Sequence, residues 1–281
     1  MKPYVLGVYE KGLPREFTWR GKLEAARDAG YDFLEISIDE TNEKLARLDW
    51  SAAERTELIA TTRDVGLPIR SMCLSGHRKY PLGASDPAVR VRSLEIMEKA
   101  LALADDLGVR IIQLAGYDVY YEPSTPDTVR WFGENLAKCA ALAARCGVLL
   151  GFETMETPFM DTVGKAMRWV DEIGSPYLTV YPDLGNLTNA ADGSADGVAA
   201  DLESGAGSLV AMHLKETVAG KFREIPFGTG RVDFASGIAA AWKLGVRRFV
   251  TEFWDVRDGA WESEMQTAVS MMRGILDTQE G

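Results

Sequence analysis

Histidine and cysteine are both scarce in this chain of 281 residues. Only His77 and His213 are present, so a site that needs many imidazole ligands, such as a three-zinc cluster, is excluded. The three cysteines, Cys73, Cys139 and Cys146, form neither an even disulfide framework nor a metal-type pair. This cysteine usage indicates a reducing compartment.

Positive charge and long apolar runs are also in short supply. Lys and Arg number 31 against 42 Asp and Glu, which gives a net charge of −11. Binding to nucleic acid or to anionic lipid requires an excess of basic side chains, so the charge balance argues against both partners. No apolar run approaches the roughly 20 residues of a membrane span, and MKPYVLGVYE lacks the apolar core of a signal peptide. We therefore expect a cytoplasmic protein.

Short apolar runs alternate with helical segments along the whole chain. The runs are rich in Val, Ile and Leu, as in strands that are covered on both faces. They span residues 4–9, 32–38, 69–75, 110–116, 148–154, 178–183, 209–215 and 248–253. Segments with helical spacing lie at about 17–29, 51–65, 88–107, 124–145, 161–173, 194–205, 234–244 and 260–277.

Helix-boundary signals support this alternation. Ser51 and Ser124 begin two of the helical segments, and Gly30, Gly66 and Gly108 end three of them. Eight strand–helix pairs without a composition break predict an α/β fold, with residues 1–281 forming one (β/α)8 TIM barrel. The alternative is a doubly wound open sheet, but its glycine-rich first turn is missing from the sequence YEKGLPRE.

Four ligand-type side chains fall at the predicted carboxyl ends of four consecutive strands: Glu153, Asp183, His213 and Glu252. In a (β/α)8 barrel, chemistry takes place at this end of the strands. Three carboxylates and one imidazole favour a single divalent metal ion such as Mn²⁺, Zn²⁺, Co²⁺ or Mg²⁺. The sequence therefore predicts one metal site at the barrel mouth.

A purely structural role, such as a salt bridge, is open for each of these side chains taken alone. Each lies in apolar sequence, however, where an unpaired carboxylate is costly to bury. Basic residues are scarce in the same strands, apart from Lys215 and Arg248 at strand edges. A bound metal ion would supply the missing positive charge.

Further polar residues are expected at the same end of the barrel. Lys11, His77, Arg78 and Lys215 follow predicted strands and are candidates for binding an anionic group such as a phosphate. Solvated loop charges are the alternative for each of them. Gln113, on the fourth predicted strand, is a candidate substrate contact.

Several other residues are candidates for supporting roles. Glu35 is a possible hydrogen-bond acceptor behind the site, and Glu10 is a second one. Asn186 lies three residues after the Asp183 carboxylate, where it either caps a turn or contacts a ligand. The glycines of PFGTGRVDF indicate a tight turn near the site.

With these residues in place, the chain resembles the L-ribulose-5-phosphate 3-epimerase family, also called L-xylulose-5-phosphate 3-epimerases, of the xylose-isomerase-like barrels. The resemblance covers nearly the whole chain. It is carried by LGVYEKGLP, FLEISIDET with RLDW, SMCLSGHRKYPLG followed by LEIM, IQLAGYDVYY, YPDLGNL, HLKET and PFGTGRVDF.

The resemblance implies a sugar-phosphate epimerase with Glu153, Asp183, His213 and Glu252 as metal ligands. It also makes Glu153 and Glu252 the acid/base pair. Related ketose 3-epimerases that act on free sugars often carry a histidine at the position of Asn186, so their substrate contacts do not carry over directly.

The expected reaction inverts the C3 carbon of a ketopentose 5-phosphate. Two carboxylates on opposite faces of that carbon exchange roles as base and acid, and a divalent ion stabilises the enediolate. The alternatives are a metal-dependent aldose–ketose isomerase and a non-catalytic sugar-phosphate-binding barrel. The expected partner is a small sugar phosphate, and the protein itself is expected to form a homo-oligomer, namely a dimer.

Overall fold

The structure of the protein is a computed structural model that describes residues 2–279. Its strands are β1 (Val5–Tyr9), β2 (Phe33–Ser37), β3 (Ile69–Leu74), β4 (Ile111–Ala115), β5 (Leu149–Glu153), β6 (Leu178–Val180), β7 (Met212–Leu214) and β8 (Arg248–Thr251). The helices are α1 (Trp19–Ala29), α2 (Asn42–Leu45), α3 (Ala52–Val65), α4 (Pro87–Leu107), α5 (Pro126–Cys146), α6 (Val163–Ile173), α7 (Leu184–Ala190), α8 (Ala195–Glu203), α9 (Phe234–Lys243) and α10 (Trp261–Leu276). Three short 3-10 turns are η1 (Glu10–Gly12), η2 (Ala46–Asp49) and η3 (Ser75–Arg78).

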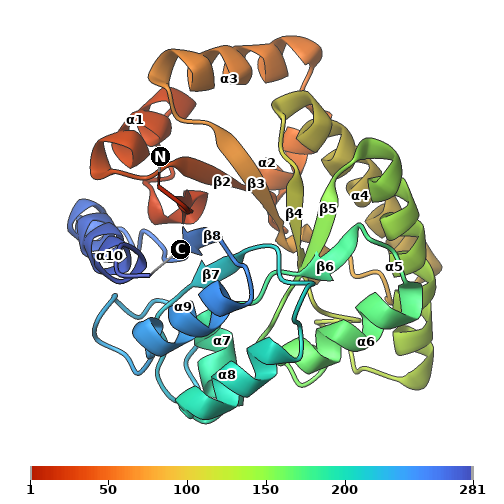
Figure 1. Ribbon diagram of the computed structural model, residues 1–281. Helices are drawn as coiled ribbons and strands as arrows, with labels where there is room; N and C mark the ends of the chain where they lie inside the picture. Colours follow the sequence, from red (N-terminus) through yellow and green to blue (C-terminus); the bar gives the residue numbers. More distant parts are fainter. Residues whose placement is uncertain (1, 280–281) are drawn as a thin grey trace.

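All eight strands are parallel and surround a common axis, with the helices in an outer ring (Figure 1). Consecutive strands pair from β1 to β6 and from β7 to β8, and β1 also pairs with β8. The two ends of the sheet, β6 and β7, are joined by isolated parallel bridges, Val180 with Leu209 and Asp183 with His213. The predicted TIM-barrel architecture is therefore confirmed.

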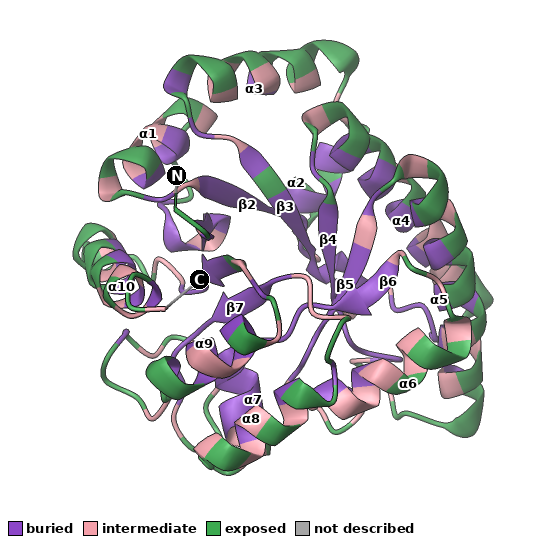
Figure 2. Cartoon of the chain, viewed as in Figure 1, coloured by how far each residue is buried: buried purple, intermediate pink, exposed green. Residues whose placement is uncertain are grey.

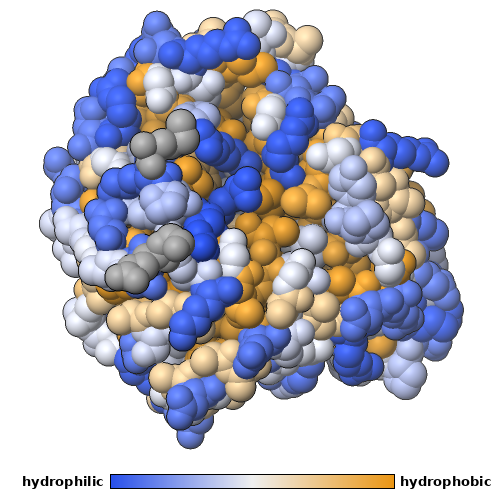
Figure 3. Space-filling model, in the orientation of Figure 1, coloured by the Kyte–Doolittle hydropathy of each residue, from blue (hydrophilic) through white to orange (hydrophobic). Residues whose placement is uncertain are grey.

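The apolar core has two main compartments, because strand side chains alternate between the two faces of the sheet, and a small third cluster of Ala115, Tyr117 and Met155 lies apart from them. One face packs against the helices, which expose their outer sides to solvent (Figure 2). The other face fills the barrel interior with Tyr9, Phe33, Cys73, Ile111, Tyr181, Ala211 and Val250. In the space-filling view of the same side, hydrophilic residues cover much of the periphery and hydrophobic ones show between them (Figure 3). No helix among residues 2–279 is long and apolar enough to cross a membrane.

The helix boundaries follow the predicted signals closely. Ser51 forms a capping box with Glu54 at the start of α3, and Gly66 ends that helix in a left-handed conformation. The start of α5 differs by one position: Thr125 caps the helix, whereas the Ser124 hydroxyl donates to Asp118.

Two short helices, α2 and α7, are absent from the sequence-based prediction. Both are too short to show a helical period in the sequence. The start of α7 is fixed by Asp183, whose side chain accepts from the backbone N–H of Asn186. Gly185 lets this helix lie against β7, because a Cβ atom there would come within 2.6 Å of the Lys215 carbonyl oxygen.

A buried ion cluster ties the first strand to the helices around it. The Glu10 carboxylate is inaccessible to solvent and accepts from Lys22 at 2.8 Å, Lys44 at 2.5 Å and both Arg47 Nη atoms at 2.6 and 2.8 Å. It also accepts from the backbone N–H of Ser37 at 2.9 Å. Burial alone would raise the pKa of Glu10, but the three cations outweigh it and hold the pKa well below 4.5.

We predict that Glu10→Gln destabilises the protein by about 3 kcal/mol at neutral pH, because three buried cations lose their counter-charge. Since the pKa of Glu10 is depressed by folding, this contribution is fully present above pH 4.5 and is lost as the pH falls through the folded-state value. The difference in unfolding free energy between wild type and variant should narrow below pH 4.5 by about 1.4 kcal/mol per pH unit.

Urea unfolding of both proteins between pH 3.5 and pH 7 measures this difference. Glu57→Gln, on the exposed side of α3, is the matched control and should change stability little at any pH. A Glu10→Gln penalty that remains constant from pH 7 to pH 3.5 would contradict the assignment.

Candidate active site

The barrel brings the four predicted ligands into one buried cluster. Glu153 ends β5, Asp183 follows β6, His213 lies in β7 and Glu252 follows β8. Each offers a ligand atom, and these atoms all lie within 4.8 Å of one another. All four side chains are buried, and His213 and Asp183 are completely inaccessible to solvent.

The orientation of the His213 ring is set from behind by Glu35 of β2. Glu35 Oε1 lies 2.6 Å from His213 Nε2, and its Oε2 accepts from Ser71 Oγ at 2.7 Å and from Tyr181 OH at 3.0 Å. The other ring nitrogen, Nδ1, faces the ligand carboxylates, at 3.2 Å from Glu252 Oε2 and 3.8 Å from Glu153 Oε1. Nδ1 is therefore the nitrogen available to a metal ion, and the supporting role expected for Glu35 agrees with this geometry.

Asp183 is positioned by the start of α7. Its Oδ1 accepts from the Asn186 backbone N–H at 2.6 Å, and the Asn186 side chain donates to the Thr154 carbonyl at 2.7 Å. Asp183, and not Asn186, is thus the capping residue of α7, and the Asn186 side chain instead joins this helix to the segment after β5. Asp183 Oδ2 is left facing the cluster.

The cluster fits a divalent cation on structural grounds. Asp183 Oδ2 is buried and has no hydrogen-bond partner within residues 2–279. Glu252 Oε2 is also buried without a hydrogen bond there, and its charge is met by the ionic contacts with Lys215 Nζ at 3.3 Å and His213 Nδ1 at 3.2 Å. Buried polar atoms without partners are rare, and unpaired carboxylate oxygens are the costliest kind. Together with one imidazole nitrogen, they form the oxygen-rich donor set that Mn²⁺, Mg²⁺, Co²⁺ and Zn²⁺ accept.

Crowding of the carboxylates moves their pKa values in different directions. Burial, reinforced by the charge of Glu252, raises the pKa of Glu153 to about 8. Burial also raises the pKa of Asp183, to about 6. For Glu252 burial acts in the same sense, but the adjacent Lys215 and His213 outweigh it and lower the pKa. The two glutamates therefore favour opposite protonation states.

Lys215 reaches this cluster from the end of β7. Its Nζ lies 3.3 Å from both Asp183 Oδ1 and Glu252 Oε2, and the side chain is buried. Burial alone would lower the pKa of Lys215, but these two carboxylates raise it above its ordinary value. The ammonium also lies 5.9 Å from the ring centroid of Trp254.

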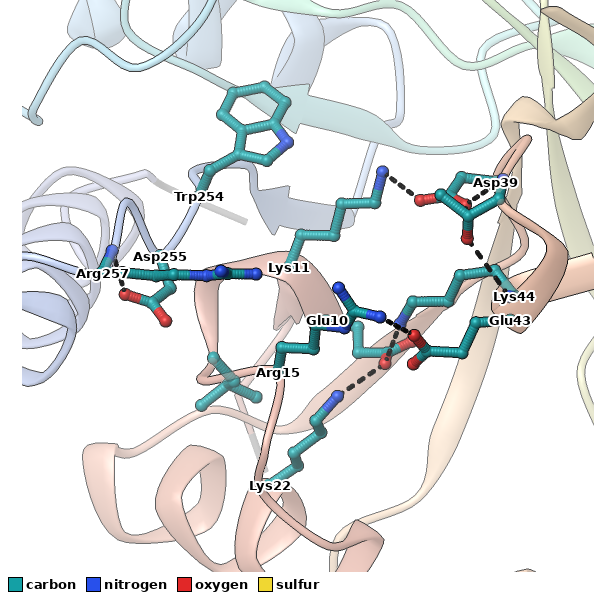
Figure 4. Close-up of a pocket in the computed structure, with 12 residues that line it drawn as sticks. Glu10, Lys11, Arg15, Lys22, Asp39, Glu43, Lys44, Trp254, Asp255 and Arg257 are labelled. Carbon is teal, nitrogen blue, oxygen red and sulfur yellow. Dashed lines mark hydrogen bonds and ion pairs between the residues drawn. The ribbon is translucent and has the colours of Figure 1, made fainter. Parts of the chain in front are cut away.

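A cavity of about 230 Å³ opens beside the cluster, between the β1–α1 loop, α2 and the segment after β8. Trp254 lines it, and its ring lies 6.4 Å from that of Tyr9, which in turn is 6.1 Å from the His213 ring. Its cationic lining residues are Lys11, Arg15, Lys22, Lys44 and Arg257 (Figure 4). Lys11 pairs with Asp39 at 2.7 Å, and Arg15 pairs with Glu43.

Positive charge is concentrated at the buried end of this cavity. Lys22, Lys44 and Arg47 share the single carboxylate of Glu10. Burial, together with the nearby Arg47 charge, lowers the pKa of Lys44 to about 8 although Glu10 acts in the opposite direction. Asp39, Glu43 and Asp255 also line the cavity, so the excess of positive charge is local to the group around Glu10, where it is suited to an anionic ligand.

The remaining predicted contacts lie in different places. The Gln113 amide nitrogen lies 3.0 Å from His213 Nδ1, beside the predicted ligand. His77 is buried in η3, where its Nε2 lies 3.1 Å from the Ser93 carbonyl oxygen of α4. Arg78 lies 5.8 and 5.1 Å from the ring centroids of Tyr117 and Tyr120, respectively. Of the proposed loop cations, the structure places Lys11 alone in the lining of the basic cavity.

Sequence reasoning missed the basic residues Arg15, Lys22 and Lys44 and their link to Glu10. Lys44 belongs to α2, which the sequence did not reveal, and Lys22 lies on the inner side of α1. The pairing of three basic side chains with one acid depends on tertiary packing. The sequence signal for this cluster was Glu10 itself, an acidic residue directly after an apolar strand.

Comparison with known proteins agrees with the barrel and its cluster. The family model for xylose isomerase-like TIM barrels matches residues 23–275. The chain belongs to the xylose isomerase-like TIM barrel family. SgbU of Escherichia coli (strain K12) is 46% identical over 261 residues, 90% of each chain. The L-ribulose-5-phosphate 3-epimerase UlaE of Shigella flexneri is 45% identical over 233 residues, which is 83% of this chain and 81% of UlaE.

Solved structures of sugar epimerases share the fold at much lower identity. A D-psicose 3-epimerase from Clostridium cellulolyticum H10 superposes with a TM-score of 0.81 at 18% identity, over 97% of this chain and 99% of its own. An L-ribulose 3-epimerase gives a TM-score of 0.77 at 20% identity, over 98% of this chain and 95% of its own. The predicted family resemblance is confirmed.

We predict that Glu35→Gln weakens metal binding by about 10- to 100-fold, because a neutral amide orients and polarises the His213 ring less well than a carboxylate. Isothermal titration of the metal-free protein with Mn²⁺ measures this directly. Glu172→Gln, on the exposed side of α6, is the control and should bind Mn²⁺ like the wild type. Unchanged Mn²⁺ affinity in Glu35→Gln would show that the ring orientation does not depend on Glu35.

Proposed function

We propose that the protein is a metal-dependent 3-epimerase that interconverts L-ribulose 5-phosphate and L-xylulose 5-phosphate. The observation that carries this proposal is the pair Glu153 and Glu252, two buried carboxylates on separate strands that flank the same cation-binding cluster. Relatives at 45% identity that bear the name L-ribulose-5-phosphate 3-epimerase support the substrate class.

Each protein group then has a defined task. Asp183 Oδ2, His213 Nδ1 and one oxygen of each glutamate would hold the divalent ion, which supplies stabilisation of negative charge on the ketose oxygens. The ionised glutamate removes the C3 proton, and the protonated one returns a proton to the opposite face. Burial and the mutual repulsion of the two carboxylates move the pKa values of Glu153 and Glu252 apart, so the pair favours one protonated and one ionised member.

The phosphate would occupy the basic cavity beside Trp254. Lys11 lines this cavity at its open side, while the cations around Glu10 provide positive charge behind it. The aromatic rings of Tyr9 and Trp254 lie between the cavity and His213, so the carbon chain would pass between the two sites. Arg78 is the competing phosphate ligand, and its Nε is a buried atom without a hydrogen-bond partner within residues 2–279.

The first test follows the C3 proton. With the wild type in D₂O, proton NMR should show deuterium at C3 and both epimers. An aldose–ketose isomerase would instead form an aldose and leave the C3 proton in place, and a binding protein would leave the ketose unchanged. We predict that Glu153→Gln and Glu252→Gln each lower epimerisation by about 10²- to 10⁴-fold. Each variant should still exchange C3 of one epimer, and the two variants should differ in which epimer this is.

The metal content of each variant must be measured alongside, because both glutamates are proposed ligands. Glu172→Gln provides a wild-type control. Sustained epimerisation by either active-site variant with a full complement of metal would refute the two-glutamate mechanism.

The second test locates the phosphate. We predict that Lys11→Met raises KM for L-ribulose 5-phosphate by about tenfold with a smaller effect on kcat, because it removes one charged contact to the phosphate. The same change should leave kcat/KM for unphosphorylated L-ribulose nearly unaltered. Arg78→Met is the matched comparison: if it raises KM and Lys11→Met does not, the phosphate lies near the Tyr117 and Tyr120 rings instead.

The homodimer and the cytoplasmic location remain predictions from the sequence. A single divalent ion from the set Mn²⁺, Zn²⁺, Co²⁺ and Mg²⁺ is likewise a prediction.

A further inference from the structure

Lys215 is the basic side chain that reaches the carboxylate cluster itself. It is buried at the end of β7, two residues after His213, and its Nζ is 3.3 Å from one oxygen each of Asp183 and Glu252. The cations of the basic cavity pair instead with Glu10, Asp39 and Glu43. Lys215 is thus placed at the reaction centre and not at the proposed phosphate site.

The ammonium and a metal ion would use different atoms of Asp183. Lys215 contacts Oδ1, whereas Oδ2 is the oxygen without a hydrogen-bond partner in the described chain. A metal ion can therefore bind Oδ2 while the lysine keeps its contact with Oδ1. The site can accommodate the positive charges of both the ammonium and a metal ion, because the four carboxyl groups of Glu35, Glu153, Asp183 and Glu252 are buried there.

We propose that Lys215 is a catalytic residue whose ammonium group, in addition to the divalent ion, stabilises the negative charge that forms on the ketose oxygens during epimerisation. This inference rests on the proposed function. When a glutamate takes the C3 proton, the C–H electron pair forms the C2–C3 double bond and the carbonyl pair moves onto the C2 oxygen. The ammonium donates a hydrogen bond to that oxygen and keeps its own protons. Reprotonation of C3 on the other face returns the electrons.

This role predicts opposite effects on metal binding and on turnover. A fixed ammonium beside the cluster repels an incoming divalent cation and competes for its carboxylates. Removing the charge should therefore strengthen metal binding, yet it should slow a reaction that builds negative charge on oxygen. If Lys215 only maintained the structure of the cluster, its removal would lower both the metal affinity and the turnover rate.

The experiment compares Lys215→Met with Lys215→Arg and with Lys221→Met, an exposed lysine in the loop that follows β7. Mn²⁺ titration of each metal-free protein should show binding to Lys215→Met that is about tenfold tighter than to the wild type. The kcat of metal-saturated Lys215→Met should fall about 10²- to 10³-fold, with C3 deuterium exchange falling in parallel. Lys215→Arg should recover part of kcat, and Lys221→Met should match the wild type in both assays.

Weaker Mn²⁺ binding together with lower kcat in Lys215→Met would overturn the proposal in favour of a structural role. A kcat within threefold of wild type would also overturn it. If the wild type epimerises no ketose phosphate, the proposed function fails and the catalytic role of Lys215 fails with it. In that case the Mn²⁺ titration still decides whether Lys215 competes with the cation.

Discussion

The arrangement of side chains at the barrel mouth depends on the neutralisation of buried negative charge. Closure of eight parallel strands brings Glu35, Glu153, Asp183 and Glu252 into a space that solvent scarcely reaches. Lys215 contacts only two of these carboxylates, and His213 is shared among three. The low polarity of the site makes uncompensated carboxylates costly, so the arrangement is suited to binding a cation.

This electrostatic demand explains why distant elements are joined at the cluster. The ligands come from β5 to β8, but the His213 ring is oriented by Glu35 of β2, which also receives hydrogen bonds from Ser71 of β3 and Tyr181 after β6. The ring can turn Nδ1 toward the carboxylates only when β2 and β7 face each other across a closed barrel. Fold and site therefore depend on each other: the barrel places the charges, and their compensation favours one barrel geometry.

The sequence was sufficient for the repeating parts of the fold, because eight apolar runs and their intervening helices report burial on a regular period. It was also sufficient for the four ligand-type residues, since strand ends converge in this architecture. It did not reveal α2 or α7, which are too short to show a helical period. It also did not reveal the ion pairs of Lys22, Lys44 and Arg47 with Glu10. Those contacts join residues from separate elements, and no local pattern records them. His77 shows the converse: a loop histidine near the site turns out to be buried against the Ser93 carbonyl.

Two neighbouring regions of the mouth carry opposite excess charge. Around Glu153, Asp183 and Glu252 the surplus is negative and calls for a cation, whereas around Glu10 three cations share one carboxylate. A ketose phosphate is complementary to this arrangement. Its C2 and C3 oxygens can bind a metal ion at one end, and its dianionic phosphate is at C5, the other end. In the reverse orientation the dianion would face the ligand carboxylates, and like charges would repel at close range. The separation of charge would thus favour one orientation of the proposed substrate, in which C3 would lie between the two glutamates.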